Sequence, residues 1–418
     1  MNIAIIGTGY VGLTTGVCLA SKGHQVTCVD LDQEKINMIN SGTPPIFEEG
    51  MKELLEEVIS AGLLIATIDS ENAIKHAEII FLCVGTPSKD DGSINLEYLK
   101  KAANTIAEKA GNHKIVVIKS TVVPGTTMNA VKPILDASGI NHGLCMNPEF
   151  LKEGAAIKDF LEGDRVVLGV TDKETETIMR ELYKDFPQQL FITNPTTAEM
   201  IKYANNSLLA TKISFANELG NLCKKLGIDS YEVMDGVGLD KRLSRQFLNC
   251  GAGFGGSCFP KDVKAIISKG LEEGEGMKLL KTVIEVNNEQ PVKMIKLLEK
   301  HANPVNKKIG ILGLAFKQGT DDVREAPSIA IINELLKMNS DITVYDPEAM
   351  SNAKKIFSDK IKYAESAREC ANKSDAILIL TGWDEFRKPE LYSNKIVIDG
   401  RRIKEAEQNA KIYEGICW

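Results

Sequence analysis

Asn2-Ile-Ala-Ile-Ile-Gly-Thr-Gly-Tyr-Val-Gly12 is the stretch that decides the fold of this 418-residue chain. Its apolar run predicts a short buried strand over residues 2–6, and its three glycines predict a tight turn that leads into a helix. A second apolar run, residues 25–29, ends at Asp30, close to the spacing of about 20 residues at which an acidic residue follows a dinucleotide-binding fingerprint. The stretch therefore predicts a βαβ unit.

A strand, a glycine turn, a helix, a second strand and an acidic residue follow one another in this order, which is typical of a dinucleotide-binding site. The glycines allow a tight turn, close approach of a pyrophosphate and close packing of helix on strand. The helix N-terminus offers unpaired N–H donors to the phosphate, and the Asp30 carboxylate accepts from ribose hydroxyls. An acid at this place disfavours a 2′-phosphate, so NAD is expected rather than NADP. The alternative is a purely structural turn, which the complete βαβ context disfavours.

Around this unit the first 190 or so residues alternate apolar runs with amphipathic stretches. Because the runs are continuously apolar, they predict a parallel sheet buried on both faces, in a doubly wound α/β domain. The further strands expected here are residues 79–84, 115–119 and 166–170, and the expected helices are residues 48–61, 96–110 and 126–137.

The middle of the chain predicts helices. Thr196-Thr-Ala-Glu199 matches a capping box, and apolar residues then recur at helical spacing until Gly227 provides a stop. We expect one long helix with an apolar stripe wide enough to bury against a partner. Shorter helices are expected over residues 229–237, 262–269 and 277–298.

After Lys307 the alternation returns. Lys308-Ile-Gly-Ile-Leu-Gly313, followed by a run ending at Asp346, echoes the opening of the chain without the third glycine. This echo predicts a second Rossmann-like domain that does not bind a dinucleotide in the same way. Its expected strands are residues 309–312, 341–344, 376–380 and 396–398, and its first helix is residues 328–338. The predicted domains are 1–195, 196–300 and 301–418.

Composition limits the function classes. The chain is 43% hydrophobic and 26% charged, and its net charge of −7 argues against a nucleic-acid or membrane-surface partner. Nine cysteines without any C-x-x-C pair suit a reducing cytoplasm rather than a disulfide framework. Neither they nor the five histidines form a metal-ligand pattern, so we expect no metal. A signal peptide or membrane span is not expected either.

Gly251-Ala-Gly-Phe-Gly-Gly-Ser-Cys258-Phe-Pro-Lys-Asp262 is the most informative stretch for chemistry. Its glycines let backbone approach a ligand, and Pro260 suits the first turn of a helix. A cysteine at a helix N-terminus beside Lys261 is expected to have a depressed pKa and to act as a nucleophile. The alternative is a buried structural cysteine, which is how we interpret the other eight.

Lys202 and Asn206 lie four residues apart on the predicted long helix, so they share one face. On spacing alone, a solvated stripe and a functional pair are equally plausible.

Taken together, these motifs resemble the UDP-glucose/GDP-mannose dehydrogenase family from Asn2 to about Ile403. The motifs that carry the resemblance are Gly-Thr-Gly-Tyr-Val-Gly (7–12), Val-Gly-Thr-Pro (84–87), Lys-Ser-Thr-Val-Val-Pro-Gly-Thr (119–126), Asn-Pro-Glu-Phe-Leu-Lys-Glu-Gly (147–154), Glu199-x-x-Lys202-x-x-x-Asn206, Gly-Phe-Gly-Gly-Ser-Cys-Phe-Pro-Lys-Asp (253–262), Ala-Phe-Lys-x-x-Thr-Asp-Asp-x-Arg (315–324) and Asp399-Gly-Arg-Arg402.

The resemblance implies a four-electron oxidation of the C6 alcohol of a nucleotide sugar to a carboxylate with two NAD, with UDP-glucose as the expected substrate. It implies a Cys258 thiohemiacetal and thioester, with Lys202 and Asn206 stabilising the oxyanions. Thr121 and Glu153 would hold the water, and Asp262 and Glu149 would assist proton transfer. The division of work among these carboxylates stays open. An active site in the cleft between the terminal domains and at least a homodimer are also implied.

The remaining site residues follow from the same resemblance. For the cofactor they are Gly7, Gly9, Tyr10, Val11, Gly12, Asp30, Lys35, Thr86, Pro87, Ser120, Thr121, Glu153 and Arg324. For the substrate they are Glu149, Phe150, Leu151, Lys152, Lys202, Asn206, Arg242 (toward a neighbouring subunit), Phe247, Gly251, Phe254, Gly255, Phe316, Lys317 and Arg402, with Arg401 as the alternative to Arg402.

The sequence departs from some relatives in two places. Asn249 stands where some carry a lysine near the diphosphate. Ser257 stands where relatives that oxidise UDP-N-acetylmannosamine carry a histidine, which disfavours that sugar. GDP-mannose relatives share the Gly-Gly-Ser-Cys motif, so the same chemistry on GDP-mannose or a UDP-N-acetylhexosamine is the alternative.

Two rival functions remain. A two-electron β-hydroxyacid dehydrogenase shares the fingerprint and the Lys-x-x-x-Asn helix, but it needs neither Cys258 nor residues 307–403. A non-catalytic NAD-binding protein would have lost some of Lys202, Asn206, Cys258 and Asp262, all of which are present.

Overall fold

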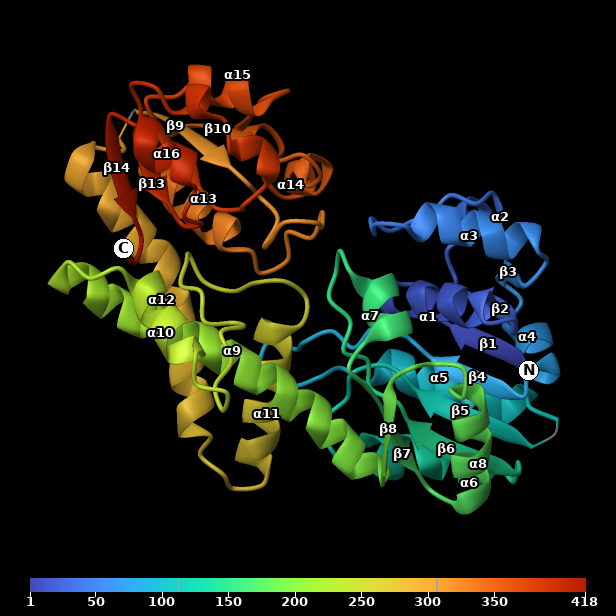
Figure 1. Ribbon diagram of the computed structural model, residues 1–418. Helices are drawn as coiled ribbons and strands as arrows, with labels where there is room; N and C mark the ends of the chain where they lie inside the picture. Colours follow the sequence, from blue (N-terminus) through green and yellow to red (C-terminus); the bar gives the residue numbers. More distant parts are fainter. Residues whose placement is uncertain (112, 306) are drawn as a thin grey trace. The chain divides into compact units, whose positions relative to one another are not determined.

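The computed structural model describes residues 1–111, 113–305 and 307–418. The chain forms two compact units, Met1–Asn205 and Asn206–Trp418. The boundary lies within one helix, α9 (Pro195–Leu226), which confirms the predicted long helix nearly to the residue (Figure 1).

The first unit is built on an eight-stranded sheet with the order β3-β2-β1-β4-β5-β6-β7-β8. All neighbours are parallel except β6 and β7. Its strands are β1 (Asn2–Ile6), β2 (Gln25–Val29), β3 (Leu64–Thr67), β4 (Ile79–Leu82), β5 (Lys114–Ile118), β6 (His142–Met146), β7 (Arg165–Val170) and β8 (Gln189–Thr193). Its helices are α1 (Tyr10–Ser21), α2 (Gln33–Asn40), α3 (Met51–Ser60), α4 (Ser70–His76), α5 (Glu97–Lys109), the π-helical turn η1 (Thr127–Val131), α6 (Lys132–Ser138), α7 (Ala156–Glu162) and α8 (Lys173–Leu182).

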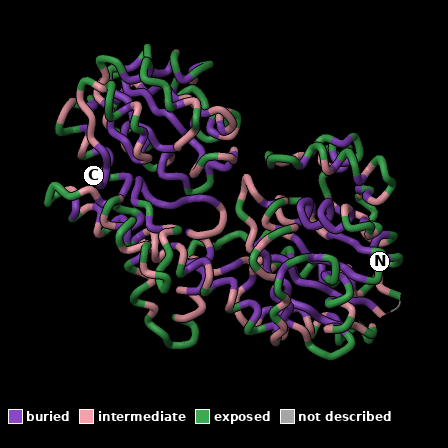
Figure 2. Tube along the Cα trace, viewed as in Figure 1, coloured by how far each residue is buried: buried purple, intermediate pink, exposed green. Residues whose placement is uncertain are grey.

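This sheet is buried on both faces, as its apolar strands predict. Side chains alternate across a strand, so Ile3 and Ile5 pack in one apolar cluster with α1 and α3, whereas Ala4 packs in another with α4 and α5. Figure 2 shows the strands as mainly buried segments, with exposed residues on the outer helices and turns.

The second unit repeats the pattern with a six-stranded parallel sheet in the order β11-β10-β9-β12-β13-β14. Its strands are β9 (Lys308–Leu312), β10 (Asp341–Tyr345), β11 (Lys362–Tyr363), β12 (Ala376–Ile379), β13 (Ile396–Asp399) and β14 (Ile412–Gly415). Its helices are α10 (Ser230–Gly238), α11 (Phe259–Glu272), α12 (Lys278–His301), α13 (Pro327–Lys337), α14 (Met350–Phe357), η2 (Ser358–Lys360), α15 (Ala367–Asn372), η3 (Asp384–Phe386), η4 (Pro389–Leu391) and α16 (Lys404–Asn409). The predicted fold of two Rossmann-like sheets is confirmed.

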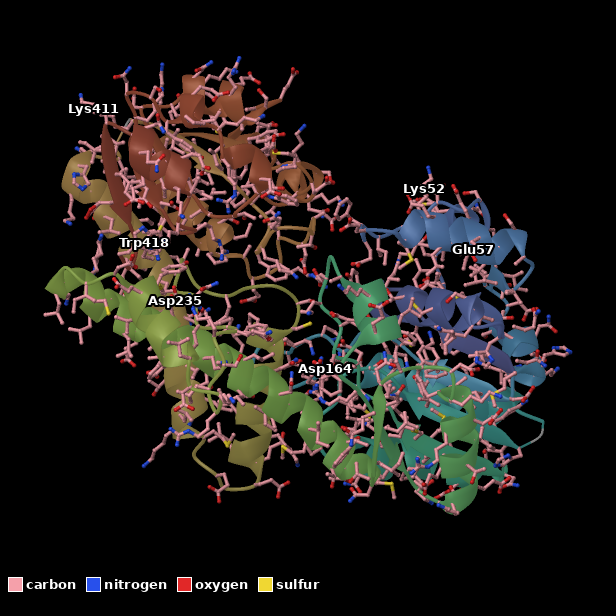
Figure 3. All side chains as sticks on the ribbon, viewed as in Figure 1. Lys52, Glu57, Asp164, Asp235, Lys411 and Trp418 are labelled. Atoms are coloured by element: carbon pink, nitrogen blue, oxygen red, sulfur yellow. The ribbon has the colours of Figure 1, made fainter. Side chains whose placement is uncertain are left out.

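The last residues of the chain pack within this second unit. Trp418, labelled in Figure 3, donates its indole N–H to the Tyr413 hydroxyl at 2.9 Å, and its carbonyl accepts from Lys224 of α9 at 2.9 Å. Its ring meets Tyr231 edge-on, with centroids 5.3 Å apart. These contacts hold the segment 416–418 against α9 and α10.

Two local expectations are wrong. Helix α9 is capped by Asn194, whose side chain accepts from the Thr197 N–H at 2.9 Å, so 196–199 is not a capping box. Glu199 instead accepts from the N–H groups of Gly125 and Thr127, at 2.6 and 2.7 Å. The helix expected over 126–137 is divided into η1 and α6, with Pro133 in the first turn of α6.

Glycine packing in the second unit gives a test of these contacts. A Cβ on Gly220, inside α9, would lie 2.8 Å from Cβ of Cys417, whereas a Cβ on Gly236, inside α10, would meet nothing within 4 Å. Gly220→Ala is therefore expected to lower the thermal unfolding midpoint, at a cost of about 1–3 kcal/mol for overpacking. Gly236→Ala should raise the midpoint, because alanine is more favourable than glycine inside a helix by about 0.5–1 kcal/mol. Equal effects of the two substitutions would contradict the packing of segment 416–418 on α9.

Candidate active site

The predicted cofactor residues of the first unit follow consecutive strands of its sheet. Because parallel strands end at the same edge, these residues gather there, on both sides of the reversal in strand order between β1 and β4, where doubly wound sheets bind ligands. Gly7 and Gly9 follow β1, Tyr10, Val11 and Gly12 begin α1, Asp30 follows β2, Thr86 and Pro87 follow β4, and Ser120 and Thr121 follow β5; Lys35 is half-buried on α2.

Close packing at the fingerprint requires glycine. A Cβ on Gly12 would lie 1.9 Å from the carbonyl oxygen of Gly7, so any other residue would force the turn open. The helix therefore starts directly against β1, which leaves its first N–H groups at the sheet edge.

Asp30 keeps its charge and some capacity to accept a ligand. Its Oδ2 accepts from the N–H and hydroxyl of Thr8, at 2.9 and 2.7 Å, and its Oδ1 accepts from the Asp32 N–H at 3.1 Å. Burial is the largest single effect and would raise the pKa of this carboxyl, but the hydrogen bonds from Thr8 and Asp32 and the Lys35 charge together lower it. With three donors on about four lone-pair sites, one site remains for a ribose hydroxyl.

A buried ion pair joins two of the predicted catalytic residues. The Lys202 Nζ of α9 donates to Glu149 Oε1 at 2.8 Å, and the two side chains are 3% and 6% exposed. Burial raises the pKa of Glu149, but the Lys202 ammonium and the Leu151 N–H on its Oε2 contribute to a larger opposing effect. The pKa is therefore lowered and the carboxylate is ionised. The Phe150 ring lies beside the pair, its centroid 5.5 Å from Nζ. The ammonium is thus fixed in a dry site, where it acts strongly on a developing negative charge.

Lys119 is a second buried ammonium in this unit, and sequence reasoning gave it no role. Its Nζ donates to Asn147 Oδ1 at 2.9 Å, and the Tyr183 hydroxyl donates to the same oxygen at 2.7 Å. Burial lowers the pKa of Lys119 to about 8.

In the second unit, Cys258 is the N-cap residue of α11 and is partly exposed. Its carbonyl accepts from the Asp262 N–H at 2.8 Å, one turn on. The Asp262 carboxylate, 1% exposed, accepts from Asn206 Nδ2 at 2.7 Å and from Lys261 Nζ at 2.6 Å. The structure thus brings the predicted nucleophile, amide donor and acid–base residue into one cluster.

The backbone that leads to Cys258 is held by buried side-chain amides. Asn287 of α12 accepts from the Phe254 N–H at 2.7 Å and donates to the Phe254 carbonyl at 3.0 Å, in the way a neighbouring strand would. Gln290 donates to the Gly251 carbonyl at 2.9 Å, and Asn217 of α9 accepts from the Gly251 N–H at 2.8 Å. These amide residues were not foreseen. The available signal is that Asn287 and Gln290 occupy positions on the buried face of α12 where apolar residues are usual.

The predicted substrate residues of the second unit divide into two groups. Phe316 lies against the glycine loop, because a Cβ on Gly256 would meet its ring at 2.8 Å, and the Gly256 N–H donates to the Arg324 carbonyl at 2.8 Å. Lys317 lies over the Phe316 ring at 5.8 Å. Arg242 instead pairs with Asp240 on an exposed turn.

The two arginines after β13 behave differently. The Arg401 guanidinium donates to the carbonyl oxygens of Leu380 and Phe316, at 2.6 and 3.0 Å. Arg402, with a φ of +58°, pairs with Asp229 and lies 4.4 Å from the Tyr231 ring. The Arg401 guanidinium thus binds backbone carbonyl oxygens, whereas Arg402 pairs with a side chain at a partly exposed site.

Burial separates Cys258 from the other cysteines as predicted. The other eight are all buried, and burial raises the pKa of Cys18, Cys28, Cys83 and Cys370 to about 12. Among the described residues no group of His, Cys, Asp and Glu is arranged to hold a metal ion, and no helix in that part of the chain is long and apolar enough to cross a membrane.

Comparison with known proteins decides the family. Residues 1–187 match the NAD binding domain of the UDP-glucose/GDP-mannose dehydrogenase family, residues 196–289 its central domain and residues 310–406 its UDP binding domain. The chain belongs to the UDP-glucose/GDP-mannose dehydrogenase family. The predictions of this family, of NAD as the cofactor and of an NAD-dependent oxidoreductase are confirmed.

Individual relatives cover almost the whole chain. It is 43% identical to the UDP-glucose 6-dehydrogenase YwqF of Bacillus subtilis, over 96% of this chain and 93% of the relative. It is 44% identical to the UDP-glucose 6-dehydrogenase AglM of Haloferax volcanii, over 96% and 97%. The structure of a UDP-glucose dehydrogenase from the archaeon Pyrobaculum islandicum matches with a TM-score of 0.96 at 38% identity, covering 100% of this chain and 97% of that one.

The amide contacts of α12 predict a specific loss of activity. Asn287→Ala leaves the N–H and carbonyl of Phe254 without partners, at about 1–3 kcal/mol for each buried group. It should lower NAD reduction at saturating substrate and speed alkylation of Cys258 by iodoacetamide, because the loop loosens. The matched control is Asn288→Ala, since Asn288 is the exposed neighbour on the same helix. Equal activity of the two variants would show that Asn287 does not position the loop.

Proposed function

We propose that this chain oxidises the C6 alcohol of UDP-glucose to the carboxylate of UDP-glucuronate and reduces two NAD for each sugar. The observation that carries this proposal is Cys258 at the start of α11, with Asp262 tied to Asn206 one turn on. A dehydrogenase that only transfers one hydride needs no nucleophile there. The names of the relatives in Bacillus and Haloferax support UDP-glucose as the sugar nucleotide.

The proposed reaction has four steps. The alcohol loses a proton and a hydride, giving an aldehyde and the first NADH. The Cys258 thiolate adds to the aldehyde carbon, and the oxygen takes up a proton to give a thiohemiacetal. Loss of a second hydride and a proton forms a thioester and the second NADH. Water then attacks the thioester carbon, which releases the carboxylate and returns the thiol.

Each addition places negative charge on an oxygen, and Lys202 and Asn206 are the proposed donors to it. They lie one turn apart on α9, and both are nine-tenths or more buried. In the proposal the Lys202–Glu149 ion pair keeps the ammonium in place between turnovers, and Glu149 and Asp262 carry protons. Thr121 and Glu153 hold the water that hydrolyses the thioester. The cofactor and substrate residues named from sequence keep their proposed roles.

Other sugar nucleotides are the alternative substrates. Ser257 before the cysteine disfavours UDP-N-acetylmannosamine, and the names of the relatives do not favour GDP-mannose. The three-domain division at 195 and 300 and a cytoplasmic location also stay predictions.

A homodimer is part of the proposal. Leu208, Phe215 and Leu222 of α9 are 63%, 47% and 51% exposed, and their spacing of seven places them in one row along the helix. An apolar row of this kind suits a second copy of the chain, and Arg242 is proposed to reach the sugar site of that copy.

Stoichiometry tests the chemistry. With limiting UDP-glucose and excess NAD, two NADH per sugar are expected by absorbance. Cys258→Ser should yield at most one, because a serine hydroxyl forms no thioester; Cys223→Ser, a buried cysteine of the same unit, should keep two. One NADH from the unaltered protein would mean that the reaction stops at the aldehyde. Two from GDP-mannose alone would change the substrate and keep the mechanism.

The oligomeric state tests the helix row. Leu208→Glu and Leu222→Glu together should shift the protein from dimer to monomer in sedimentation velocity, because two charges would be buried without partners. Ile356→Glu, an equally apolar exposed position on α14, is the control. A monomer before any substitution would refute the dimer.

A further inference from the structure

Glu48 is a buried carboxylate that neither the motifs nor the proposed reaction uses. It lies in the segment between α2 and α3, is 7% exposed, and is followed by the exposed Glu49. Its Oε1 accepts from the Ala156 N–H at 2.7 Å, and its Oε2 accepts from the Gly154 N–H at 2.7 Å and from the Tyr10 hydroxyl. Both oxygens therefore bind groups that are distant in sequence.

The two backbone partners belong to the turn that follows Glu153. Gly154 has a φ of +81°, and the next residue, Ala155, caps α7 without any side-chain acceptor. The Ala156 N–H at this end of α7 is buried and would be costly to leave without its Glu48 acceptor. Glu48 supplies the acceptors, so it fixes the backbone directly C-terminal to Glu153.

The third partner connects this turn to the dinucleotide fingerprint. Tyr10 is the first residue of α1, and its hydroxyl donates to Glu48 while accepting from the Gly154 N–H at 2.9 Å. Burial and the Glu48 carboxylate raise the pKa of Tyr10, so the phenol keeps its proton at neutral pH and stays a donor. Tyr10, Gly154 and Glu48 are thus each hydrogen-bonded to the other two.

We propose that Glu48 is a positioning residue for Glu153: it fixes the position of the 153–156 turn relative to the start of α1, where the dinucleotide is expected to bind. The proposal rests on the role proposed above for Glu153, which is to hold the hydrolytic water. A displacement of about 1 Å in such a group can cost about 100-fold in rate. The expected consequence of losing Glu48 is therefore a slow thioester hydrolysis, with the earlier oxidations less affected.

Glu48→Gln tests this inference. A glutamine is nearly the same size, but its NH₂ group would face an N–H donor of Gly154 or Ala156, so at least one hydrogen bond is lost. We expect kcat to fall by about 10- to 100-fold while KM for UDP-glucose changes less than about threefold. Enzyme quenched during turnover should carry more UDP-glucuronyl adduct on Cys258 by intact-protein mass. Glu49→Gln is the matched control and should behave as the unaltered protein.

Three further measurements keep the test decisive. Tyr10→Phe, which retains the Glu48 carboxylate, should shift adduct and kcat in the same direction by a smaller factor. Amide hydrogen exchange of a peptide covering 150–157 should accelerate in Glu48→Gln and stay unchanged in Glu49→Gln. Glu153→Gln should accumulate the same adduct as Glu48→Gln.

Different outcomes overturn different parts. A lower kcat in Glu48→Gln without adduct, or a change confined to KM for NAD, would show that Glu48 serves the fold or the cofactor site and would refute the positioning role. Adduct in Glu153→Gln but not in Glu48→Gln refutes the inference alone. If Glu153→Gln forms no adduct, the water role of Glu153 fails, and the positioning role fails with it.

Discussion

Every buried backbone N–H and C=O group needs a partner, and this requirement shapes the functional loops of the protein. The loops that carry reactive residues are too irregular to pair within a helix or sheet. Side chains pair with them instead: Glu48 with the turn after Glu153, Glu199 with residues 125–127, and Asn287 with Phe254. Each of these buried polar side chains therefore fixes a segment that has little regular structure of its own.

The two sheets show how one topology serves two tasks. Both have the doubly wound order, and each has an acid after its second strand. Asp30 keeps one lone-pair site for a ligand. Asp346 accepts from the N–H groups of Leu314, Ala315, Glu348 and Ala349 and from the Trp383 indole, so it has no site left for a ribose. The carboxylate that is predicted to recognise a nucleotide in one sheet stabilises a loop in the other.

Burial also assigns the charged and nucleophilic groups. A thiol inside an apolar core stays protonated, as the raised pKa values of Cys28 and Cys370 indicate, and is therefore a poor nucleophile. Cys258 differs by being a partly exposed helix N-cap residue. Lys202 shows how a buried ammonium is accommodated, since it pairs with the buried Glu149 carboxylate at 2.8 Å.

Local pattern was sufficient for most of the interior strands and for the long helix, because each depends on neighbours in sequence. The strands that were not anticipated are β3, β6, β8, β11 and β14, and four of these are sheet edges. An edge strand is covered on fewer sides, so its apolar signal is weaker; Gln189–Thr193 of β8 contains no fully buried residue. The capping-box prediction is wrong because Glu199 accepts hydrogen bonds from the N–H groups of Gly125 and Thr127. These residues lie more than 70 positions away, so no local pattern associates them with Glu199.

The sequence by itself determined the family and the cofactor and predicted Cys258 as the nucleophile, because these depend on residue types at fixed local spacing. Only the tertiary structure decided which side chains fix the segments beside the predicted site residues. In the sequence, Glu48 is an acid between two helices, Asn287 is an amide within a helix and Lys119 is a charged residue at the end of a strand. Their partners lie in segments that are distant along the chain, and a buried polar group is satisfied by whichever distant segment the fold brings to it.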